Sequence, residues 1–469
     1  MPLAVKMRGT SRGANRVKKT LNIDTGGTMQ EVDIILEGGT ILTLDDADTI
    51  IPSGAVAIRK DTIVAVGPRS DVMGRYNGRT VIEATNHVIM PGLVNAHTHA
   101  AMTCFRGIAD DLELMEWLNR YIFPAEAKNV DPELAYWGSL LACVEMIRSG
   151  TTTFCDMYIF EDETAKAASL AGMRCLLGEV LFDFPSPNFK TPDEGLAYTK
   201  DLIEKWAKDP LVHITVEPHA LYTCSEELLK KSKALADRYG VPLALHLLET
   251  KSEREGLVAK LGCSPVQYLQ NLGLLDENLV AFHCVWLDAA DIEMFARASA
   301  KVVHNPESNM KLASGVAPVP DLQAAGVTVA LGTDGCASNN NLDMFQEMDT
   351  AAKLHKAFRL DPTVMSAGAV LKMATRNGAR ALGMENEVGV LRPGMKADVI
   401  TVDFNSPHLT PVYSEHSHLV YCASGSDVDT VVINGRIVMR NRKLLTVDEQ
   451  EVMDRVNRIA RRIRESLGM

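Results

Sequence analysis

The stretch MPGLVNAHTHAAM, residues 90–102, joins an apolar run to two histidines, His97 and His99. The run is typical of a buried β-strand, in which side chains at positions i and i+2 project from the same face. Both imidazoles can therefore reach one point in space. An H-x-H pair alone is weak evidence for a metal site, so its meaning depends on how the chain continues.

Seven further apolar runs follow this stretch, and helix-like segments separate them. The eight candidate strands are GLVNAHTH, GTTTFCDM, MRCLLGEVLF, VHITVEPHAL, VPLALHLLET, NLVAFHCVWL, AKVVHNPESN and VTVALGTDGC. Strands that alternate with helices over residues 89–387 predict an α/β fold, specifically a (β/α)8 barrel of the TIM type. A doubly wound open sheet is the alternative, but no Gly-rich phosphate loop follows the first strand.

The two ends of the chain share a different pattern. Short apolar runs with turn signals fill residues 31–88, and they return in residues 388–445, where Asn434-Gly435 is a strong hairpin signal. We expect these two segments to form one small β-sandwich domain beside the barrel.

Two terminal segments lie outside these domains. Residues 1–30 begin with a basic stretch that lacks the apolar centre of a secretory signal. We interpret them as a disordered extension, or as an upstream start with Met29 as the true first residue. Residues 446–469 predict a C-terminal helix, with Thr446 and Glu449 in capping-box spacing and an apolar stripe that packs on the protein.

The composition limits the possible partners. A net charge of −12 argues against a nucleic-acid binder, which would need a basic face. No apolar run is long enough to span a bilayer, so we expect no membrane contact. The nine cysteines form no C-x-x-C pair and several lie in apolar runs, which favours reduced thiols in a cytoplasmic protein.

Histidines and acids gather where the candidate strands end, which is where barrels of this kind carry their active sites. Seven of the twelve histidines fall within the eight strand segments. Neutral imidazole and carboxylate groups are good ligands for Zn²⁺ or Fe²⁺ and leave room for a water molecule. The strand-end residues are His97, His99, Glu217, His219, His246, Glu249, His283, His304 and Asp334.

These motifs resemble the amidohydrolase superfamily, within it the deaminases that act on 5′-methylthioadenosine and S-adenosylhomocysteine. The resemblance runs from Val32 to the C-terminus through PGLVNAHTHAAMTCFRGIADDLELMEWL, PHALYTCSEE, LHLLET, AFHCVWL, VHNPESNMKLASGVAP and LGTDGCASNNNLDMFQEM. It implies hydrolytic deamination of a 6-aminopurine nucleoside to the inosine analogue and ammonia. It also implies a homo-oligomer, because relatives commonly are.

The resemblance implies one divalent metal ion, most simply Zn²⁺, with Fe²⁺ or Mn²⁺ as alternatives. Binuclear relatives carboxylate a lysine on the fourth strand, and VHITVEPHAL contains none. By the resemblance, His283 orients the attacking water, Glu249 protonates N1 of the purine, and Asp334 moves the water's proton to the departing ammonia. The implied metal ligands are His97, His99, His246 and Asp334.

The resemblance also implies substrate contacts. His219 matches the residue that contacts the purine, besides Glu249. Glu126 matches the carboxylate that holds the ribose hydroxyls, and Trp117 is either a wall of the nucleoside pocket or a buried core indole.

One position departs from the pattern. Relatives that act on S-adenosylhomocysteine carry an arginine near the end of the third strand, where this chain has Glu179, although Arg174 lies nearby. A carboxylate there would repel the carboxylate of that substrate. We therefore expect a preference for 5′-deoxyadenosine, 5′-methylthioadenosine or adenosine, and we expect Glu179→Arg to favour S-adenosylhomocysteine.

Two other functions remain possible at this level. Amidohydrolases that act on amino- or chloro-substituted heterocycles, such as guanine or s-triazines, share the H-x-H pair and the later histidine. Asp334, Glu249 and Glu126 favour the nucleoside deaminase. A catalytically silent scaffold on the same fold is the second alternative, and the four filled ligand positions argue against it.

Overall fold

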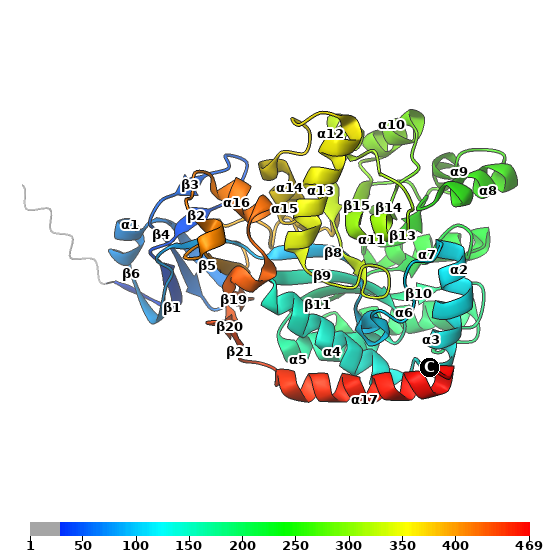
Figure 1. The fold of residues 1–469 in the computed structure, drawn as a ribbon, viewed down its shortest axis with the longest axis horizontal. Helices are drawn as coiled ribbons and strands as arrows, with labels where there is room; N and C mark the ends of the chain where they lie inside the picture. The colour runs from blue at the N-terminus through cyan, green and yellow to red at the C-terminus, as the bar shows by residue number, and fades with distance from the viewer. Residues whose placement is uncertain (1–28) are drawn as a thin grey trace, which may run out of the picture.

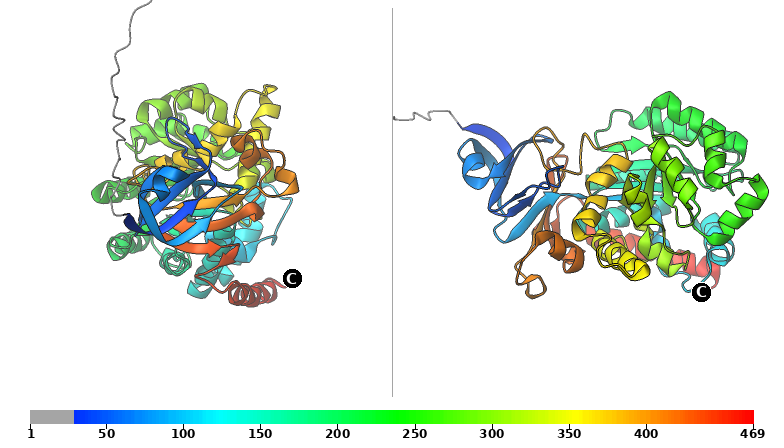
Figure 2. Two further views of the ribbon diagram at one scale, coloured as in Figure 1. Left: turned by 90° about the vertical axis from the view of Figure 1, so that its left-hand side faces the viewer. Right: turned by 90° about the horizontal axis from the view of Figure 1, so that it is seen from above.

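The computed structural model describes residues 29–469 (Figure 1). The basic extension expected over residues 1–30 therefore lies almost wholly outside the described residues. The described chain has a mixed α/β architecture, with β-sheets formed by the two terminal segments at one end and a larger α/β part beside them (Figures 1 and 2).

Each of the eight predicted strand segments of the α/β part contains at least one strand. The fourth and eighth segments are each interrupted, so that ten strands result. Their bounds are β8 (Leu93–His99), β9 (Thr151–Tyr158), β10 (Arg174–Leu181), β11 (Val212–Ile214), β12 (Glu217–Pro218), β13 (Leu243–Leu247), β14 (Leu279–His283), β15 (Lys301–His304), β16 (Val329–Leu331) and β17 (Asp334–Gly335).

Parallel pairings, two isolated bridges and one chain connection link these strands into a circuit. Strand β8 pairs with β9, β9 with β10, and β10 with both β11 and β12. Parallel bridges Val216–Leu243 and Ala220–His246 lead to β13, which continues to β14, β15 and β16. Strand β17 follows β16 in the chain and pairs with β8, where the circuit began.

Apolar side chains fill both faces of this circuit. Alternate residues such as Ala96, Cys155 and Leu176 share one core on the inner face, and their neighbours Phe154 and Leu177 pack toward the surrounding helices. Buried parallel strands accordingly read as continuous apolar runs, which explains why the sequence predicts them. The helices are α4 (Pro132–Arg148), α5 (Glu161–Ala171), α6 (Pro192–Trp206), α7 (Glu226–Tyr239), α8 (Lys251–Leu261), α9 (Pro265–Asn271), α10 (Ala289–Ala298), α11 (Pro306–Lys311), α12 (Val319–Ala324), α13 (Met344–Arg359), α14 (Ala367–Met373) and α15 (Arg376–Ala381).

The two terminal segments share a seven-stranded sheet of order β21-β20-β19-β18-β7-β2-β3. Strand β18 pairs antiparallel with β7, so that Ile400 lies opposite Met90 and joins the two ends of the chain. The strands are β2 (Thr40–Leu42), β3 (Ile50–Ile51), β7 (His87–Pro91), β18 (Val399–Asp403), β19 (Val428–Ile433), β20 (Arg436–Arg440) and β21 (Lys443–Leu444), and α16 (Glu415–Tyr421) follows β18 in the chain.

A second, four-stranded sheet of order β5-β4-β1-β6 packs with the first, and the two share one apolar core. Strand β1 of this sheet and strand β2 of the first sheet do not pair with each other across Gly38-Gly39. The strands are β1 (Gln30–Glu37), β4 (Gly54–Arg59), β5 (Thr62–Pro68) and β6 (Tyr76–Glu83), with α1 (Arg69–Met73) before β6.

The C-terminal helix α17 (Glu449–Leu467) lies along α4 at the edge of the α/β part (Figure 1). Its predicted cap was wrong: Asp448 accepts the backbone N–H groups of Gln450 and Glu451, whereas the Thr446 hydroxyl donates to the Ala171 carbonyl. The predicted apolar stripe is buried at Val452, Val456, Ile459 and Ile463. Over residues 29–469, we find no helix with the length and apolar character needed to cross a membrane.

Candidate active site

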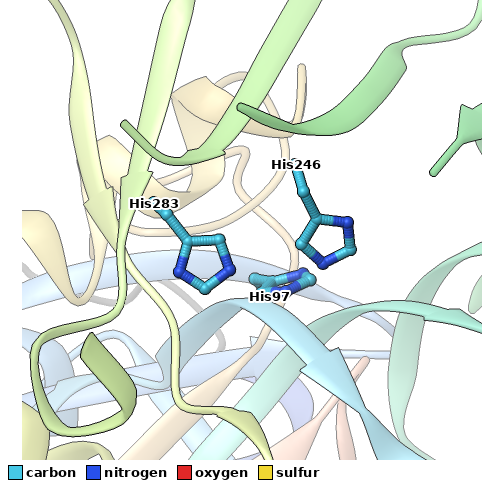
Figure 3. Close-up of side chains that lie close together, drawn as sticks. All are labelled: His97, His246 and His283. Carbon is cyan, nitrogen blue, oxygen red and sulfur yellow. The ribbon is translucent and has the colours of Figure 1, made fainter. Parts of the chain in front are cut away.

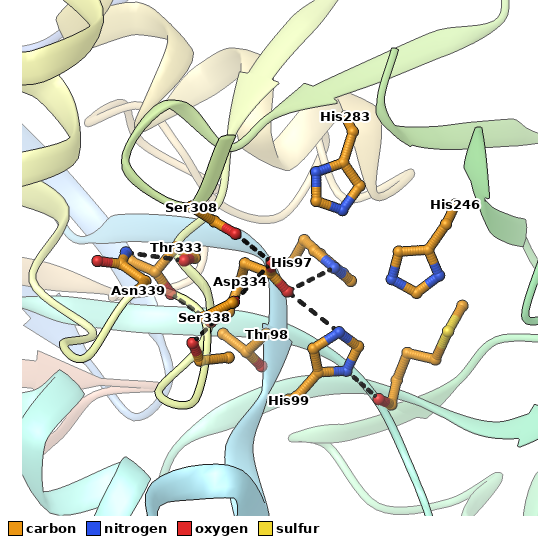
Figure 4. A network of polar contacts seen from close by, with 12 residues as sticks. His97, Thr98, His99, His246, His283, Ser308, Thr333, Asp334, Ser338 and Asn339 are labelled. Carbon is orange, nitrogen blue, oxygen red and sulfur yellow. Dashed lines mark hydrogen bonds and ion pairs between the residues drawn. The ribbon is translucent and has the colours of Figure 1, made fainter. Parts of the chain in front are cut away.

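The predicted metal ligands converge where strands of the circuit end (Figures 3 and 4). One oxygen of Asp334, Oδ1, lies 3.3 Å from Nε2 of His97 and 3.1 Å from Nε2 of His99. The ring of His246 has its centre 5.0 Å from that of His97. His283 completes the group, with its ring centre 5.5 Å from that of His246.

Two of these residues have left-handed backbone conformations at a strand boundary, since His283 ends β14 and Asp334 begins β17. His283 has φ of 66° and Asp334 has φ of 62°, a region that non-glycine residues seldom adopt. Such conformations concentrate at functional sites, where the surrounding structure holds them in place. At both residues a strand boundary coincides with a side chain of the group.

Burial and mutual contact set the charges of the group. Burial lowers the pKa of His97 to about 3 and that of His246 well below its usual value, so both rings are neutral. Burial opposes ionisation of Asp334, but the imidazoles of His97 and His99 beside its Oδ1 atom hold its pKa well below the usual range. Burial also opposes protonation of His99, yet the same carboxylate raises the pKa of His99 to about 9.

A divalent cation fits this group of side chains. Neither ring nitrogen of His97 makes a hydrogen bond to any described residue, although the ring is fully buried. Buried polar atoms without a partner are rare and indicate a position that binds an ion or water. Neutral imidazoles and one carboxylate are the donor set that Zn²⁺ takes in hydrolytic sites.

Hydrogen bonds from the opposite side fix the direction of each imidazole. Nδ1 of His99 lies 2.5 Å from the Met157 carbonyl oxygen, and Nδ1 of His246 lies 3.0 Å from the His219 carbonyl oxygen. A carbonyl oxygen only accepts, so these Nδ1 atoms carry the hydrogen and their Nε2 atoms face the centre. Such contacts orient ligands and increase their basicity.

Two hydroxyl groups orient Asp334 in the same way. Ser308 and Ser338 both donate to Oδ2 of Asp334, at 2.6 and 2.9 Å (Figure 4). Its Oδ1 atom is therefore the one left facing His97 and His99.

Glu249 lies beside the group and is buried. Its Oε1 atom accepts a hydrogen bond of 3.2 Å from Ser314, and Oε2 lies 3.9 Å from Nε2 of His283. Burial raises the pKa of Glu249 above its usual value. A raised pKa favours the protonated form of a carboxyl group, which is the form that a general acid needs.

A mostly apolar pocket opens onto these residues. Three predicted substrate contacts lie in its wall: Trp117 on η2 (Trp117–Ile122), Glu126 on α3 (Phe123–Asn129) and His219 after β12. The short elements before them are η1 (Ala100–Phe105) and α2 (Leu114–Glu116). The wall comprises His99, Met102, Leu114, Trp117, Leu118, Ile122, Phe123, Glu126, Met157, Tyr158, Ile159, Val180, Phe182, His219, Tyr222, His246, Glu249, His283, Leu312, Asp334 and Ser338.

Polar groups in the wall are held in place. The Tyr158 hydroxyl donates to Oε1 of Glu126 at 2.7 Å, and burial raises the pKa of Glu126 to about 7. The indole of Trp117 donates to the Ala109 carbonyl at 3.2 Å, so its ring faces the pocket while its N–H is satisfied. Burial lowers the pKa of His219 to about 3.

The structure does not bring Glu179 into this pocket, contrary to the sequence-based expectation. Side chains alternate along β10, and Val180 and Phe182 take the inward positions. Glu179 points outward, is fully buried, and accepts hydrogen bonds from the Glu161 backbone N–H at 3.0 Å and from Asn188 at 2.9 Å. Glu179 therefore makes no direct contact with the pocket that would support the predicted repulsion at the 5′ end of the substrate.

Three other candidate residues also lie elsewhere. Arg174 pairs with Asp398 at 2.9 Å. His304 contacts His355 on α13, with 3.1 Å between their Nε2 atoms. Glu217 lies in the interior against Cys155 and Thr215, and a Cβ atom on Gly178 would overlap it.

Several residues of the pocket and the site are not predicted by the sequence patterns. Tyr158 is the last residue of β9 and Phe182 follows β10, so the rule that located the histidines would have located them as well. Ser308, Ser338 and Asn309 lie in quoted motifs but carry no spacing signal of their own. Asn309 accepts from Nδ1 of His283 at 2.9 Å.

Comparison with known proteins agrees with this geometry. The model of the amidohydrolase family matches residues 88–438. A protein of Syntrophus aciditrophicus named 5-methylthioadenosine/S-adenosylhomocysteine deaminase 1 is 63% identical over 439 residues, which are 94% of this chain and 99% of that protein. A Methanosarcina barkeri protein named 5′-deoxyadenosine deaminase is 47% identical over 430 residues, 91% of this chain and 98% of that protein.

Solved structures give the same result. An adenosine deaminase from Xanthomonas campestris with bound zinc has a TM-score of 0.92 at 39% identity, with 93% of this chain and 100% of that chain covered. A family match across most of the chain, together with relatives that align over nearly its whole length, establishes that this protein belongs to the amidohydrolase family.

Proposed function

We propose that this protein deaminates a 6-aminopurine nucleoside by hydrolysis, with the inosine analogue and ammonia as products. The observation that carries the proposal is one pocket that contains the imidazole–carboxylate group, the buried acid Glu249 and the buried carboxylate Glu126. The names of relatives at 63%, 56% and 47% identity support the same reaction.

His97, His99, His246 and Asp334 would hold one divalent ion, for which we propose Zn²⁺. When bound, such an ion supplies Lewis acidity, which lowers the pKa of a water molecule to about 7. The zinc in the Xanthomonas campestris structure supports this choice, and Fe²⁺ and Mn²⁺ suit the same donors.

The side chains move the protons of the reaction. As water oxygen bonds to C6 of the purine, Asp334 takes one water proton and Glu249 gives its proton to N1. The C6–N bond then breaks while the amino group receives the proton from Asp334 and leaves as ammonia. The proton of the new C6 hydroxyl returns to Glu249, and His283 orients the water throughout.

The pocket wall also indicates which 5′-substituents are accepted. Among the described residues that line the pocket there is no Lys or Arg to pair with a carboxylate. We propose that 5′-deoxyadenosine, 5′-methylthioadenosine and adenosine are preferred over S-adenosylhomocysteine, since an unpaired charge is costly to desolvate. The composition of the pocket wall supports this preference, whereas Glu179 lies outside the wall.

A substrate panel tests the reaction class. We expect ammonia release from the three neutral nucleosides at a kcat/KM at least about tenfold above that for S-adenosylhomocysteine, the equivalent of about 1.4 kcal/mol. Guanine and s-triazines lack the ribose diol that Glu126 is placed to bind, so we expect no turnover of either. Turnover of those heterocycles alone would favour the other amidohydrolase reaction, and no bound metal with no activity would favour a scaffold.

The raised pKa of Glu126 predicts how binding depends on pH. Only the ionised carboxylate offers both oxygens as acceptors for the ribose hydroxyls. With a pKa of about 7, that form is lost as the pH falls. We expect KM for adenosine to rise about tenfold for each pH unit below 7. KM for 2′,3′-dideoxyadenosine, which lacks the diol, should stay constant over the same range; equal changes for both nucleosides would contradict the assignment.

We propose a finer architecture as well. The closed circuit of parallel strands supports a (β/α)8 barrel over residues 89–387, and the two sheets with their shared core support a β-sandwich from residues 31–88 and 388–445. Residues 446–469 form the helical segment packed on α4. A cytoplasmic homo-oligomer remains our proposal from the cysteine usage and from the family.

A further inference from the structure

The strand that carries His97 and His99 has an irregular register. Asn95 lies opposite Phe154 of β9, but Thr98 lies opposite Asp156. Two residues of β8 therefore face a single residue of β9 at this point, which is a β-bulge. A bulge locally disrupts the ladder and re-aims the side chains beyond it.

The side chain of Asp156 accepts hydrogen bonds from the part of β8 that follows the bulge and from the next residue. Its Oδ1 atom accepts the Thr98 hydroxyl at 2.5 Å and the Ala100 backbone N–H at 2.5 Å. Thr98 stands between His97 and His99, and Ala100 follows them directly. Asp156 is fully buried and lies on the outer face of β9, away from the substrate pocket.

A second buried acid stands behind Asp156. Glu161 is the first residue of α5, and neither of its carboxyl oxygens finds a hydrogen-bond donor among the described residues. Burial and the adjacent Asp156 carboxylate raise the pKa of Glu161 well above its usual value. Glu179 in turn accepts the backbone N–H of Glu161 at 3.0 Å and so fixes the start of α5.

We infer that Asp156 is a positioning residue that holds the segment Thr98–Ala100, directly after the bulge, so that His97 and His99 present their Nε2 atoms to one metal ion. Glu179 and Glu161 support Asp156 from the far side of the strand. Glu179 therefore acts on the metal site indirectly, through Glu161 and Asp156. The inference rests on the proposed metal site but not on the identity of the substrate.

Zinc affinity, measured by competition with a chromophoric chelator, tests the inference without using activity. We expect Asp156→Ala to weaken zinc binding about 10- to 100-fold, as loss of an outer partner of a metal ligand typically does. Asp156→Asn keeps an oxygen that accepts from Thr98 and Ala100 and gains an N–H for Glu161. Its affinity should remain within about threefold of the parent.

A matched variant separates positioning from loss of stability. Asp291 is also buried, with its Oδ2 atom accepting from Arg254 at 2.6 Å and from the Asp288 backbone N–H at 3.2 Å, and it contacts neither β8 nor β9. We expect Asp291→Ala to lower Tm without changing zinc affinity. The d–d absorption of Co²⁺-loaded protein should change in Asp156→Ala and remain that of the parent in Asp291→Ala.

Each outcome has a separate meaning. Parent-like zinc affinity in Asp156→Ala, or equal losses in the two alanine variants, would overturn the inference while leaving the proposed function intact. A parent that binds no zinc would instead overturn the proposed metal site. If Asp156→Ala does not fold, Thr98→Val removes a single hydroxyl from the same contact. Its zinc affinity must then fall below that of the parent for the inference to stand.

Discussion

Replacement of Glu249 by Gln should lower kcat about 10²- to 10⁴-fold, the usual contribution of a general acid. The amide has the shape of the carboxyl group and can still accept from Ser314, which now lies 3.2 Å from Oε1. It has no proton to give to N1 of the purine. Because Glu249 is outside the ligand set, zinc content should equal that of the parent. Steady-state kinetics with 5′-deoxyadenosine and metal analysis of the same sample measure both quantities.

A second carboxylate of the same pocket provides the contrast. Glu126 lies on α3 and is placed to bind the ribose, so Glu126→Gln should raise KM more than it lowers kcat. An interaction present in both the ground state and the transition state affects KM, whereas one made only in the transition state affects kcat. If Glu249→Gln kept more than about a tenth of the parent kcat, Glu249 would not be the general acid.

The histidine positions could be predicted because two simple rules act together. Side chains alternate along a strand, and parallel strands of such a fold end at the same edge. His97, His99 and His246 therefore had to meet once the strands were identified. Continuous apolar runs identified those strands, since buried parallel strands are apolar on both faces.

Because such strands are apolar on both faces, the sequence does not indicate which face of a strand points inward. Along β10 nothing in LLGEVLF marks the inner face, so Glu179 was placed in the pocket when Val180 and Phe182 occupy it. A charged residue beside an active site also invites a functional reading. The structure shows that its carboxylate is used by the backbone of α5 instead.

The error in the predicted helix cap has a different cause. Thr446 and Glu449 have the spacing of a capping box, but tertiary contact draws the Thr446 hydroxyl to Ala171 and the helix begins after Asp448. The local sequence pattern predicts a capping residue, but the packing of the segment before the helix decides which residue caps it. Sequence spacing alone carries no information about that packing.

Substitution of Glu179 by Arg should destabilise the protein without changing its choice of substrate, which reverses the expectation from the sequence. The arginine would leave the Glu161 backbone N–H and Asn188 without their acceptor and would introduce a larger side chain into a fully buried place. Lost hydrogen bonds and overpacking each cost about 1–3 kcal/mol. Nearby acids offset part of this cost, so we expect a loss of about 1–3 kcal/mol, measured by urea unfolding.

Phe184→Arg is the substitution that should move the preference toward S-adenosylhomocysteine. Phe184 stacks on the pocket residue Phe182 with 4.6 Å between ring centres, and it approaches Phe123 on α3, the helix that carries Glu126. We expect the 5′ carbon of a ribose held by Glu126 to point toward this side of the pocket. Because Phe184 is 40% exposed, a guanidinium group is tolerated there.

An ion pair at such a half-exposed position contributes about 1 kcal/mol or less. The ratio of kcat/KM for S-adenosylhomocysteine to that for 5′-deoxyadenosine should therefore rise about three- to fivefold in Phe184→Arg. It should stay within about twofold of the parent in Glu179→Arg. The opposite ranking of the two variants would mean that Glu179 turns into the pocket when substrate binds. The alternation along β10 would then have to break at that residue, because Val180 and Glu179 cannot both face inward on a regular strand.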